Sequence, residues 1–166
     1  MSVKSFFGFL FAKYIVYKNT WWKKNALKSQ KKIFFSLLKN AKNTRFGKEH
    51  LFSDISNYTD WKKHVPVRDY EGLKKYIDLI FEGEEDVLWP GKPLYFCKSS
   101  GTTSGVKYIP ITKKSMPNHI VAARDAIFSY IEESGNSSII NGKMIFLQGS
   151  PQLKKTGGVL TGRLSG

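Results

Sequence analysis

The sequence predicts an α/β protein. Segments whose apolar residues recur at helical spacing alternate along the chain with short, continuous apolar runs that are typical of buried strands. The chain has 166 residues, of which 41% are apolar and 14% aromatic, so it contains enough apolar material for a folded core. The single cysteine, Cys97, excludes an internal disulfide, and we interpret it as a small apolar residue within a strand rather than a nucleophile.

The first 24 residues predict a basic, amphipathic helix that leads into the α/β body. Its apolar residues recur every three or four positions: Phe6, Phe7, Leu10, Tyr14 and Tyr17. Between Met1 and Lys48 there are eleven lysines, one arginine and no acidic residue, and the net charge of the chain is +14. Such a surface suits nucleic acid or lipid head groups, and the alternative is a solvated helix face that aids solubility. The apolar run at Phe6–Ala12 is too short to span a membrane and no cleavage site follows it, so we expect a cytoplasmic protein.

Three further helices are expected between Asn25 and the acidic segment Glu82–Asp86. Asn25 is expected to cap a helix through Ala41, whose inner face contains Leu27, Gln30, Phe34, Leu37, Leu38 and Ala41. The segment Asn43–Gly47 is expected to break this helix, and a short helix at Asp60–Lys63 is expected to stop before Pro66. Asp69 is expected to open the third helix, whose buried side contains Tyr70, Leu73, Tyr76, Ile77, Ile80 and Phe81. The acidic segment lacks the alternation of a calcium-binding loop and is interpreted as a solvated turn.

A hydroxyl-rich loop, Ser99–Lys107, lies between two apolar runs that predict strands, Leu94–Cys97 and Tyr108–Ile111. It reads Ser99-Ser100-Gly101-Thr102-Thr103-Ser104-Gly105-Val106-Lys107. Its glycines let backbone N–H groups converge, its hydroxyls donate hydrogen bonds and its lysine adds positive charge, which together suit a phosphate chain. The loop matches neither the P-loop pattern nor the dinucleotide pattern. The alternative is a linker or an ordinary turn, and the flanking strands argue against it.

A last helix is expected from Lys114 to Glu133, with Thr112 as its cap and Gly135 as its terminator. Its inner face is expected to contain Ile120, Ala123, Ile127, Tyr130 and Ile131. A buried strand at Lys143–Gln148 is expected next, followed by a glycine-rich tail that contains no closing element. No carboxylate or metal partner is evident for the three histidines, so we expect partly exposed side chains: His50, His64 and His119.

Several of these segments resemble a known family. The stretch SSGTTSGVKYIPIT, Ser99–Thr112, resembles the first signature of the adenylate-forming enzymes. Four further segments resemble the amino-terminal part of the acyl acid-amido synthetases, best known from the auxin-responsive Gretchen Hagen proteins of plants: Asn43–Gly47, Val65–Tyr70, Glu82–Glu84 and Leu88–Gly91. The resemblance extends from about Ala26 to Gly166.

The resemblance implies the fold and the reaction. Residues 25–166 are expected to form the start of the amino-terminal domain of the adenylate-forming fold, and the carboxy-terminal domain is expected to be absent from this sequence. The implied enzyme is an ATP-dependent ligase that activates a small carboxylic acid as an acyl-adenylate and transfers it to an amine, such as that of an amino acid. The implied cofactors are ATP and Mg²⁺. We expect this chain to be a fragment without catalytic activity of its own.

The resemblance also assigns roles within the loop. Ser99, Ser100, Thr102 and Thr103, with Ser104, are expected to donate hydrogen bonds to ATP phosphate oxygens. Gly101 and Gly105 are expected to allow close backbone approach, and Lys107 to place positive charge near the β and γ phosphates. Arg124 is a candidate contact for the carboxylate of the acid, with a surface arginine as the alternative.

No metal ligand, adenine contact or catalytic residue is assigned within these residues, and those groups are expected beyond Gly166. The other class of function considered is a basic module that binds nucleic acid or a membrane surface. Nothing resembling a zinc finger or an aromatic RNA-binding motif accompanies the charge, so nucleic acid is not an expected partner. Peripheral membrane contact stays open but is not favoured.

Overall fold

The computed structural model describes residues 2–99, 105–143, 145, 152–156 and 158–163. The chain divides into two compact units, Met1–Lys31 with Lys114–Leu147 and Lys32–Lys113 with Gln148–Gly166. Helices and a four-stranded sheet are both present, which confirms the α/β class. The expected boundary between a lead-in and the body at residue 25 stays a prediction. Within the described residues, no helix combines the length and the hydrophobicity that a membrane span requires.

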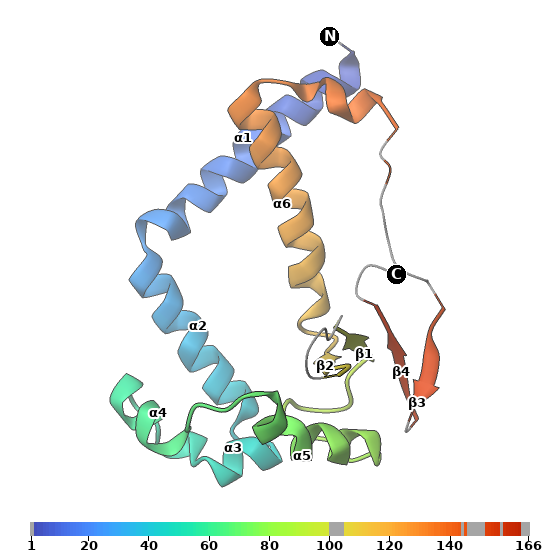
Figure 1. Cartoon of the computed structure of the whole chain (residues 1–166). Helices are drawn as coiled ribbons and strands as arrows, with labels where there is room; N and C mark the ends of the chain where they lie inside the picture. Colours follow the sequence, from blue (N-terminus) through green and yellow to red (C-terminus); the bar gives the residue numbers. More distant parts are fainter. Residues whose placement is uncertain (1, 100–104, 144, 146–151, 157, 164–166) are drawn as a thin grey trace. The chain divides into compact units, whose positions relative to one another are not determined.

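The first unit contains α1, Val3–Lys24, which crosses and packs against α6, Met116–Ser134 (Figure 1). Phe11 of α1 packs edge-to-face on Phe128 of α6, with ring centroids 4.9 Å apart. The 3-10 helix η2, Ser137–Asn141, follows α6, and the carbonyl of Ser137 accepts a hydrogen bond from the Ser5 hydroxyl at 3.3 Å. The predicted first helix is therefore real, but its predicted apolar stripe is exposed. The side of α1 that is buried carries Ser5, Ala12 and Ile15 instead.

In α6, the predicted cap and inner face are partly wrong. The helix begins after Ser115 rather than at a cap on Thr112, and Gly135 ends it in the left-handed conformation, as predicted. Ile131 is fully buried, whereas Ile120 is 65% exposed and Tyr130 also faces outward. The face that packs on α1 carries Asp125 and Phe128, so packing selected a different stripe of the helix.

Helix α2, Ala26–Ala41, was predicted at nearly the same bounds, and its residues from Lys32 onward belong to the second unit. Asn25 does not cap it with its side chain. The Asn25 amide instead donates to the carbonyl of Trp21 at 2.9 Å and so closes the end of α1. Leu38 and Ala41 are buried as predicted, but Leu27 is 83% exposed and Leu37 is also exposed. The fold therefore buries only residues near the carboxy-terminal end of the predicted apolar face of α2.

A short helix, α3, Arg45–Glu49, forms where the sequence predicted only a break. It is followed by the 3-10 helix η1, Phe52–Asp54, and by α4, Tyr58–His64, which extends the predicted helix at Asp60–Lys63 by a few residues. These elements and the end of α2 share a cluster of buried apolar side chains: Leu38, Ala41, Phe52 and Ile55. Packing against this cluster therefore stabilises α3, which is too short to be stable as an isolated helix.

The sheet has the strand order β2-β1-β4-β3. The strands β1, Tyr95–Lys98, and β2, Tyr108–Ile111, were predicted and pair antiparallel. The carboxy-terminal tail was wrongly predicted to contain no closing element. It supplies β3, Lys154–Thr156, and β4, Val159–Gly162, and β4 pairs parallel with β1. The predicted strand at Lys143–Gln148 falls mostly outside the described residues, and its described members, Lys143 and Ile145, are not in a strand.

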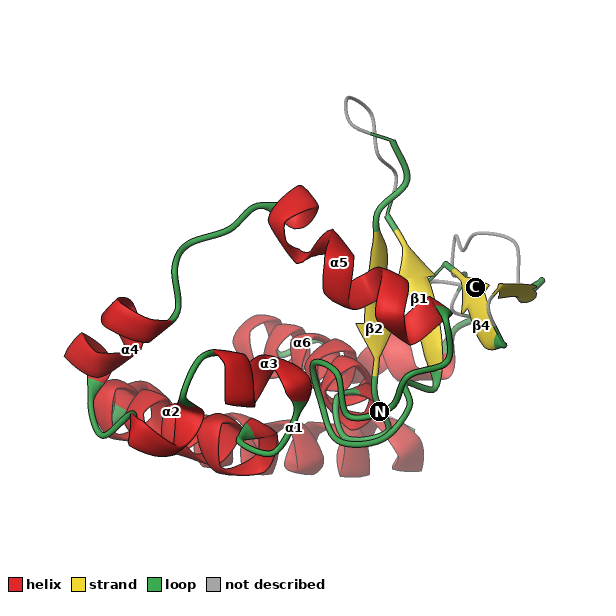
Figure 2. Cartoon of the chain, turned by 90° about the horizontal axis from the view of Figure 1, so that it is seen from below, coloured by secondary structure: helices red, strands yellow, loops and turns green. Residues whose placement is uncertain are grey.

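Helix α5, Tyr70–Phe81, lies across β1 and β2 on one face of the sheet (Figure 2). The Asp69 side chain accepts from the N–H of Gly72 at 2.8 Å, so Asp69 caps this helix as predicted. Phe81 stacks on Phe96 of β1 with ring centroids 4.2 Å apart. The main core of the unit lies here and contains Tyr76, Ile77, Ile80, Val87, Phe96 and Val159. This helix and the strands beneath it position the loop described next.

Candidate functional site

The loop that the sequence singled out begins and ends at the same rung of the sheet. Lys98 pairs with Tyr108, and one residue further the N–H of Ser99 donates to the carbonyl of Lys107 at 2.9 Å. The last strand residues and both ends of the loop are therefore held at a fixed separation. Gly105 has a φ of 80°, in the left-handed region that favours glycine. Ser100, Gly101, Thr102, Thr103 and Ser104 lie outside the described residues, so their predicted roles stay predictions.

Two lysines at the base of the loop lie against aromatic rings. The Nζ of Lys107 is 5.8 Å from the ring centroid of Tyr70, and the Nζ of Lys98 is 5.5 Å from that of Tyr108. Both distances fall within the range of cation–π interactions. The Tyr70 hydroxyl also accepts a hydrogen bond from the Tyr108 N–H at 2.9 Å. Lys107 is half-buried at the base of the loop.

Tyr70 is the first residue of α5, so the amino terminus of this helix lies at the base of the loop. The aligned peptide dipoles of a helix place partial positive charge at its amino terminus, which favours an anion nearby. The Asp69 carboxylate occupies the cap of the same helix, where it is engaged by the Gly72 N–H. Lys98 and Lys107 place positive charge at the base of the loop, while the Asp69 carboxylate offsets the partial charge of the helix end.

A further basic residue, Arg163, follows β4 beside the end of β1, and the sequence analysis did not single it out. Gly162 of β4 pairs with Cys97 of β1, so Arg163 follows level with Lys98. The two strands are parallel, and the residues that follow their carboxyl ends therefore meet at one edge. Only the pairing of β4 with β1 could have pointed to Arg163, because no motif surrounds it.

Arg124, the candidate contact for a substrate carboxylate, belongs to the first unit, whereas the loop belongs to the second. Its guanidinium donates two hydrogen bonds to Oδ1 of Asp125, at 2.8 and 2.6 Å. The Asn19 amide donates to the other oxygen of Asp125 at 2.9 Å, and Asn19 and Arg124 together lower the pKa of Asp125. Arg124 is thus already engaged in a contact between α1 and α6, and its predicted role with the acid stays a prediction.

His50 was wrongly expected to be partly exposed, because it is only 4% exposed. Its ring stacks on Phe46 at 4.0 Å between centroids, and its Nδ1 lies 2.8 Å from the Phe46 carbonyl. That carbonyl can only accept, so Nδ1 carries the proton and Nε2 accepts from Arg68, 2.7 Å away. His50 therefore fixes the end of α3 to the segment that precedes α5. His64 is half-buried and His119 is exposed, in line with the expectation.

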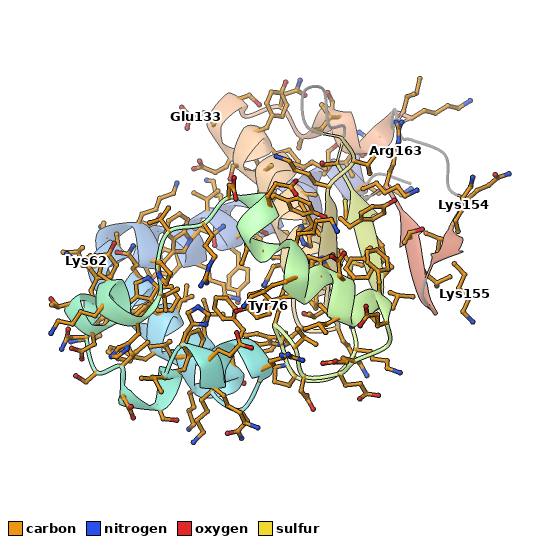
Figure 3. The ribbon with its side chains drawn as sticks, turned by 60° about the horizontal axis from the view of Figure 1, so that its bottom comes forward. Lys62, Tyr76, Glu133, Lys154, Lys155 and Arg163 are labelled. Carbon is orange, nitrogen blue, oxygen red and sulfur yellow. The ribbon has the colours of Figure 1, made fainter. Side chains whose placement is uncertain are left out.

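A carboxylate, Glu49, joins α3 to α5. The Tyr76 hydroxyl donates to Glu49 Oε2 at 2.6 Å, and Figure 3 shows the Tyr76 side chain reaching from α5 toward α3. This hydrogen bond is the main reason that the pKa of Glu49 is lowered, with Arg45 and Lys75 adding to it. The pKa of Tyr76 is raised, first by burial and then by Glu49. The cluster therefore joins α3 to α5.

Within the part of the chain that the structure describes, no three histidine, cysteine, aspartate or glutamate side chains are placed to share a metal ion. The base of the loop instead carries two lysines, which suit an anionic ligand or a cation that arrives with its phosphates.

Comparison with known proteins identifies the family. The profile of the GH3 family N-terminal domain matches residues 20–166. This chain belongs to the GH3 family. The resemblance seen in the sequence is thereby confirmed, and the GH3 match includes the loop, α5 and all four strands.

Individual relatives support the same family and fold. The GH3 chain is 32% identical over 98 residues to the indole-3-acetic acid-amido synthetase GH3.15 of Arabidopsis thaliana, a match that covers 58% of this chain and 16% of the relative. A solved structure of a GH3.15 acyl acid amido synthetase matches 85% of this chain and 26% of its own, with a TM-score of 0.73 and 24% identity. A structure of AtGH3.15 in complex with 2,4-DB matches 82% and 24%, with a TM-score of 0.70 and 24% identity. The GH3 chain therefore spans about a quarter of the solved relatives that it matches.

Proposed function

We propose that this GH3 chain contributes the ATP phosphate-binding loop of an acyl acid-amido synthetase. The observation that carries the proposal is the base of the Ser99–Lys107 loop, where the Ser99–Lys107 hydrogen bond joins the two ends of the loop beside the amino terminus of α5. Lys107 lies there against the Tyr70 ring and forms no ion pair with a carboxylate of the described residues. The names of the relatives support an acid and an amide as substrate and product. ATP, a small carboxylic acid and an amine such as an amino acid are the proposed partners.

In the proposed reaction, the carboxylate attacks the α-phosphorus of ATP and forms an acyl-adenylate, with release of pyrophosphate. An amine then attacks the acyl carbon and displaces AMP, which leaves the amide. Mg²⁺ bound to ATP would neutralise phosphate charge. In this reaction, the proposed role of the described chain is to bind the phosphates of ATP. Lys107 places positive charge near the β and γ phosphates, and Ser99, with the hydroxyls that follow it, donates hydrogen bonds to phosphate oxygens.

Binding of Mg·ATP to the 166-residue chain tests the proposal, measured by isothermal titration calorimetry at two salt concentrations. We expect Lys107→Ala to raise the Kd by at least about tenfold, because one charge-assisted hydrogen bond is typically worth about 1.5–3 kcal/mol and 1.4 kcal/mol is about a factor of ten. Lys113→Ala is the matched control, since it removes the same charge from an exposed residue of the same unit. Inorganic triphosphate is expected to compete and adenosine is not. Equal effects of the two substitutions, or no binding by the unmodified chain, would refute the proposal.

We also propose that the 166 residues do not complete the reaction alone. The small share of the relatives that they cover supports this, because substrates and a closing domain need more chain than is matched here. Acid-dependent exchange of labelled pyrophosphate into ATP, measured with the purified chain, is expected to be at background. Exchange above background that depends on the acid would overturn this proposal. The cytoplasmic location expected from the sequence stays a prediction.

A second function, peripheral contact with an anionic membrane surface, is favoured by one observation. Aromatic side chains along α1, among them Phe7, Tyr14 and Tyr17, are exposed, and Lys13 and Lys18 lie beside them. Exposed aromatic residues flanked by lysines suit the interface of an anionic bilayer. Co-sedimentation with phosphatidylglycerol vesicles, compared with phosphatidylcholine vesicles, tests this function. Substitution of Lys107 is expected to leave such binding unchanged, which separates it from ATP binding.

A further inference from the structure

Tyr70 contacts both the backbone and the lysine at the end of the loop. Its hydroxyl accepts the Tyr108 N–H at 2.9 Å, and its ring centroid lies 5.8 Å from the Nζ of Lys107. Lys107 and Tyr108 are adjacent in sequence, so one side chain on α5 holds two consecutive residues where the loop rejoins the sheet. We propose that Tyr70 is the positioning residue for Lys107, an inference that rests on the proposed function of the loop.

The hydroxyl contact satisfies a donor that the sheet leaves open. Ser99 and Lys107 form a hydrogen-bonded pair, so the next pair, Lys98 with Tyr108, is a non-hydrogen-bonded pair whose backbone groups point away from each other. Because β2 is an edge strand of the described sheet, the Tyr108 N–H points out of the sheet, and no other described strand accepts it. The Tyr70 hydroxyl takes this N–H and fixes the start of β2 to α5. Pro110, two residues on, has no N–H to satisfy at the equivalent position.

The ring contact orients Lys107 without neutralising it. Lys107 forms no ion pair with any carboxylate among the residues that the structure describes. A carboxylate partner would compete with a phosphate for the ammonium, whereas an aromatic face attracts it weakly and leaves its three N–H donors available. Lysine has a flexible four-carbon chain, so restricting it before binding reduces the entropy lost when a phosphate arrives. Tyr70 is therefore suited to preorganise the cation of the loop.

A double-mutant cycle on the 166-residue chain tests the inference, with the Kd for Mg·ATP as the measurement. We expect Tyr70→Leu to weaken binding about three- to tenfold, in line with a modest orienting contact. In the Lys107→Ala background, the same substitution is expected to change the Kd by less than about twofold, because the group that it positions is gone. Tyr95→Leu is the matched control. It removes another half-buried tyrosine that contacts neither residue, and its effect is expected to be the same in both backgrounds.

Tyr70→Phe separates the two contacts and guards against a folding failure of the leucine variant. It keeps the ring, so it is expected to retain most of the affinity that Tyr70→Leu loses. It removes the acceptor of the Tyr108 N–H, so hydrogen exchange of that amide is expected to accelerate at least about fivefold. Unchanged exchange at Tyr108, or a phenylalanine variant as weak as the leucine variant, would overturn the assignment of the two contacts.

The outcomes also distinguish this inference from the function on which it rests. If the unmodified chain does not bind Mg·ATP, the proposed function fails, and the positioning role fails with it. If the unmodified chain binds and Tyr70→Leu weakens binding equally with and without Lys107, Tyr70 is a structural residue, and the inference alone is overturned. A coupling that appears at Tyr70 and not at Tyr95 supports both.

Discussion

Replacing Thr44 with valine removes one hydroxyl at the junction of α2 and α3 and preserves the branched shape of the side chain. That hydroxyl accepts a hydrogen bond from the Gly47 N–H at 3.0 Å and donates one to the Ala41 carbonyl at 2.7 Å. The residue is 1% exposed, so water cannot replace the lost oxygen without a rearrangement. Thr44→Val therefore probes the cap of α3 with little change in packing volume.

The expected loss follows from these two contacts. The Ala41 carbonyl keeps the Thr44 N–H as a donor at 3.0 Å, so its loss is small. The Gly47 N–H keeps no partner, and a buried donor left unsatisfied costs about 1–3 kcal/mol. Loss of a threonine cap by itself is typically worth about 1 kcal/mol and up to about 2. The two figures describe the same bond from two sides, so we expect a loss of about 2 kcal/mol and not their sum.

Urea unfolding followed by circular dichroism and by tryptophan fluorescence measures this loss, since Trp61 and Trp89 pack against the cluster that α3 borders. Thr59→Val is the control, because Thr59 is exposed on α4, and we expect a change within about 0.5 kcal/mol there. Thr44→Ser keeps the hydroxyl and is expected to retain most of the stability. A loss below about 0.5 kcal/mol for Thr44→Val would show that the hydroxyl does not hold this junction, and the reasoning would be wrong.

Three further outcomes are expected. Gly47→Ala should lower the free energy of unfolding by about 2 kcal/mol or more, measured by urea unfolding. The new Cβ would lie 2.1 Å from the Ala41 carbonyl oxygen, a backbone atom that cannot move aside as a flexible side chain would. A neutral effect would contradict this expectation. Tyr76→Phe removes the hydrogen bond from the Tyr76 hydroxyl to Glu49. Because Glu49 is partly exposed, water replaces the lost donor, and we expect the free energy of unfolding at neutral pH to fall by only about 1 kcal/mol. The hydrogen bond holds the pKa of Glu49 below its usual 4.5, so its contribution is present above pH 4.5 and is lost as the pH falls through the lower folded value. Unfolding measured from pH 7 to pH 3 should therefore show a smaller acid-induced loss for Tyr76→Phe than for the unmodified chain, and equal losses would contradict the assignment. Arg163→Ala should weaken Mg·ATP binding and reduce its salt dependence, whereas Lys155→Ala, which removes the same charge from β3, should not; indistinguishable titrations would exclude Arg163 from the site.

The parts of the fold that were predicted correctly are those whose signals are local. Asp69 caps α5, and the apolar spacing behind it marks the face that packs on the sheet, so two independent signals agree on one helix. Gly135 ends α6 because a left-handed residue is needed there, a requirement that the residue type itself reveals. The two strands beside the loop are short, continuous apolar runs bounded by turn residues. In each case, the residues whose types predicted the element are the same residues that form its cap, its terminator or its strand.

The elements that were missed depend on partners far away in the sequence. Helix α3 is a single turn, too short for any periodicity, and the N–H groups of Arg45 and Phe46 donate to the carbonyls of Asp86 and Val87. Strand β4 lies in a glycine-rich tail, and Val159 is buried because its strand pairs with β1. Neither contact leaves a trace in the local sequence. The exposed stripes of α1 and α6 fail for the same reason, since spacing identifies a helix but not which side another element covers.

The residues of the candidate site were likewise predicted where the signal is local and missed where it depends on distant partners. The composition of the loop indicated a phosphate ligand and Lys107 as its cation, and these assignments stay predictions for the residues that the structure does not describe. Tyr70 was predicted only as a buried member of α5, because its contact with Tyr108 joins residues 38 positions apart. Arg163 and the buried His50 were missed because each depends on a long-range pairing.

The order of the strands explains why basic residues meet at the loop. β1 and β4 are parallel neighbours, so the residues that follow their carboxyl ends share one edge of the sheet, and the antiparallel β2 begins at that same edge. Lys98 and Lys107, at the two ends of the loop, and Arg163, after β4, therefore all lie in sequence at this edge of the sheet. Like charges gathered in this way repel and lower the stability of the unit unless an anion compensates them. The phosphate ligand proposed here would bind the folded unit and stabilise it by RT ln(1 + [L]/Kd), so we expect the ligand to offset this repulsion.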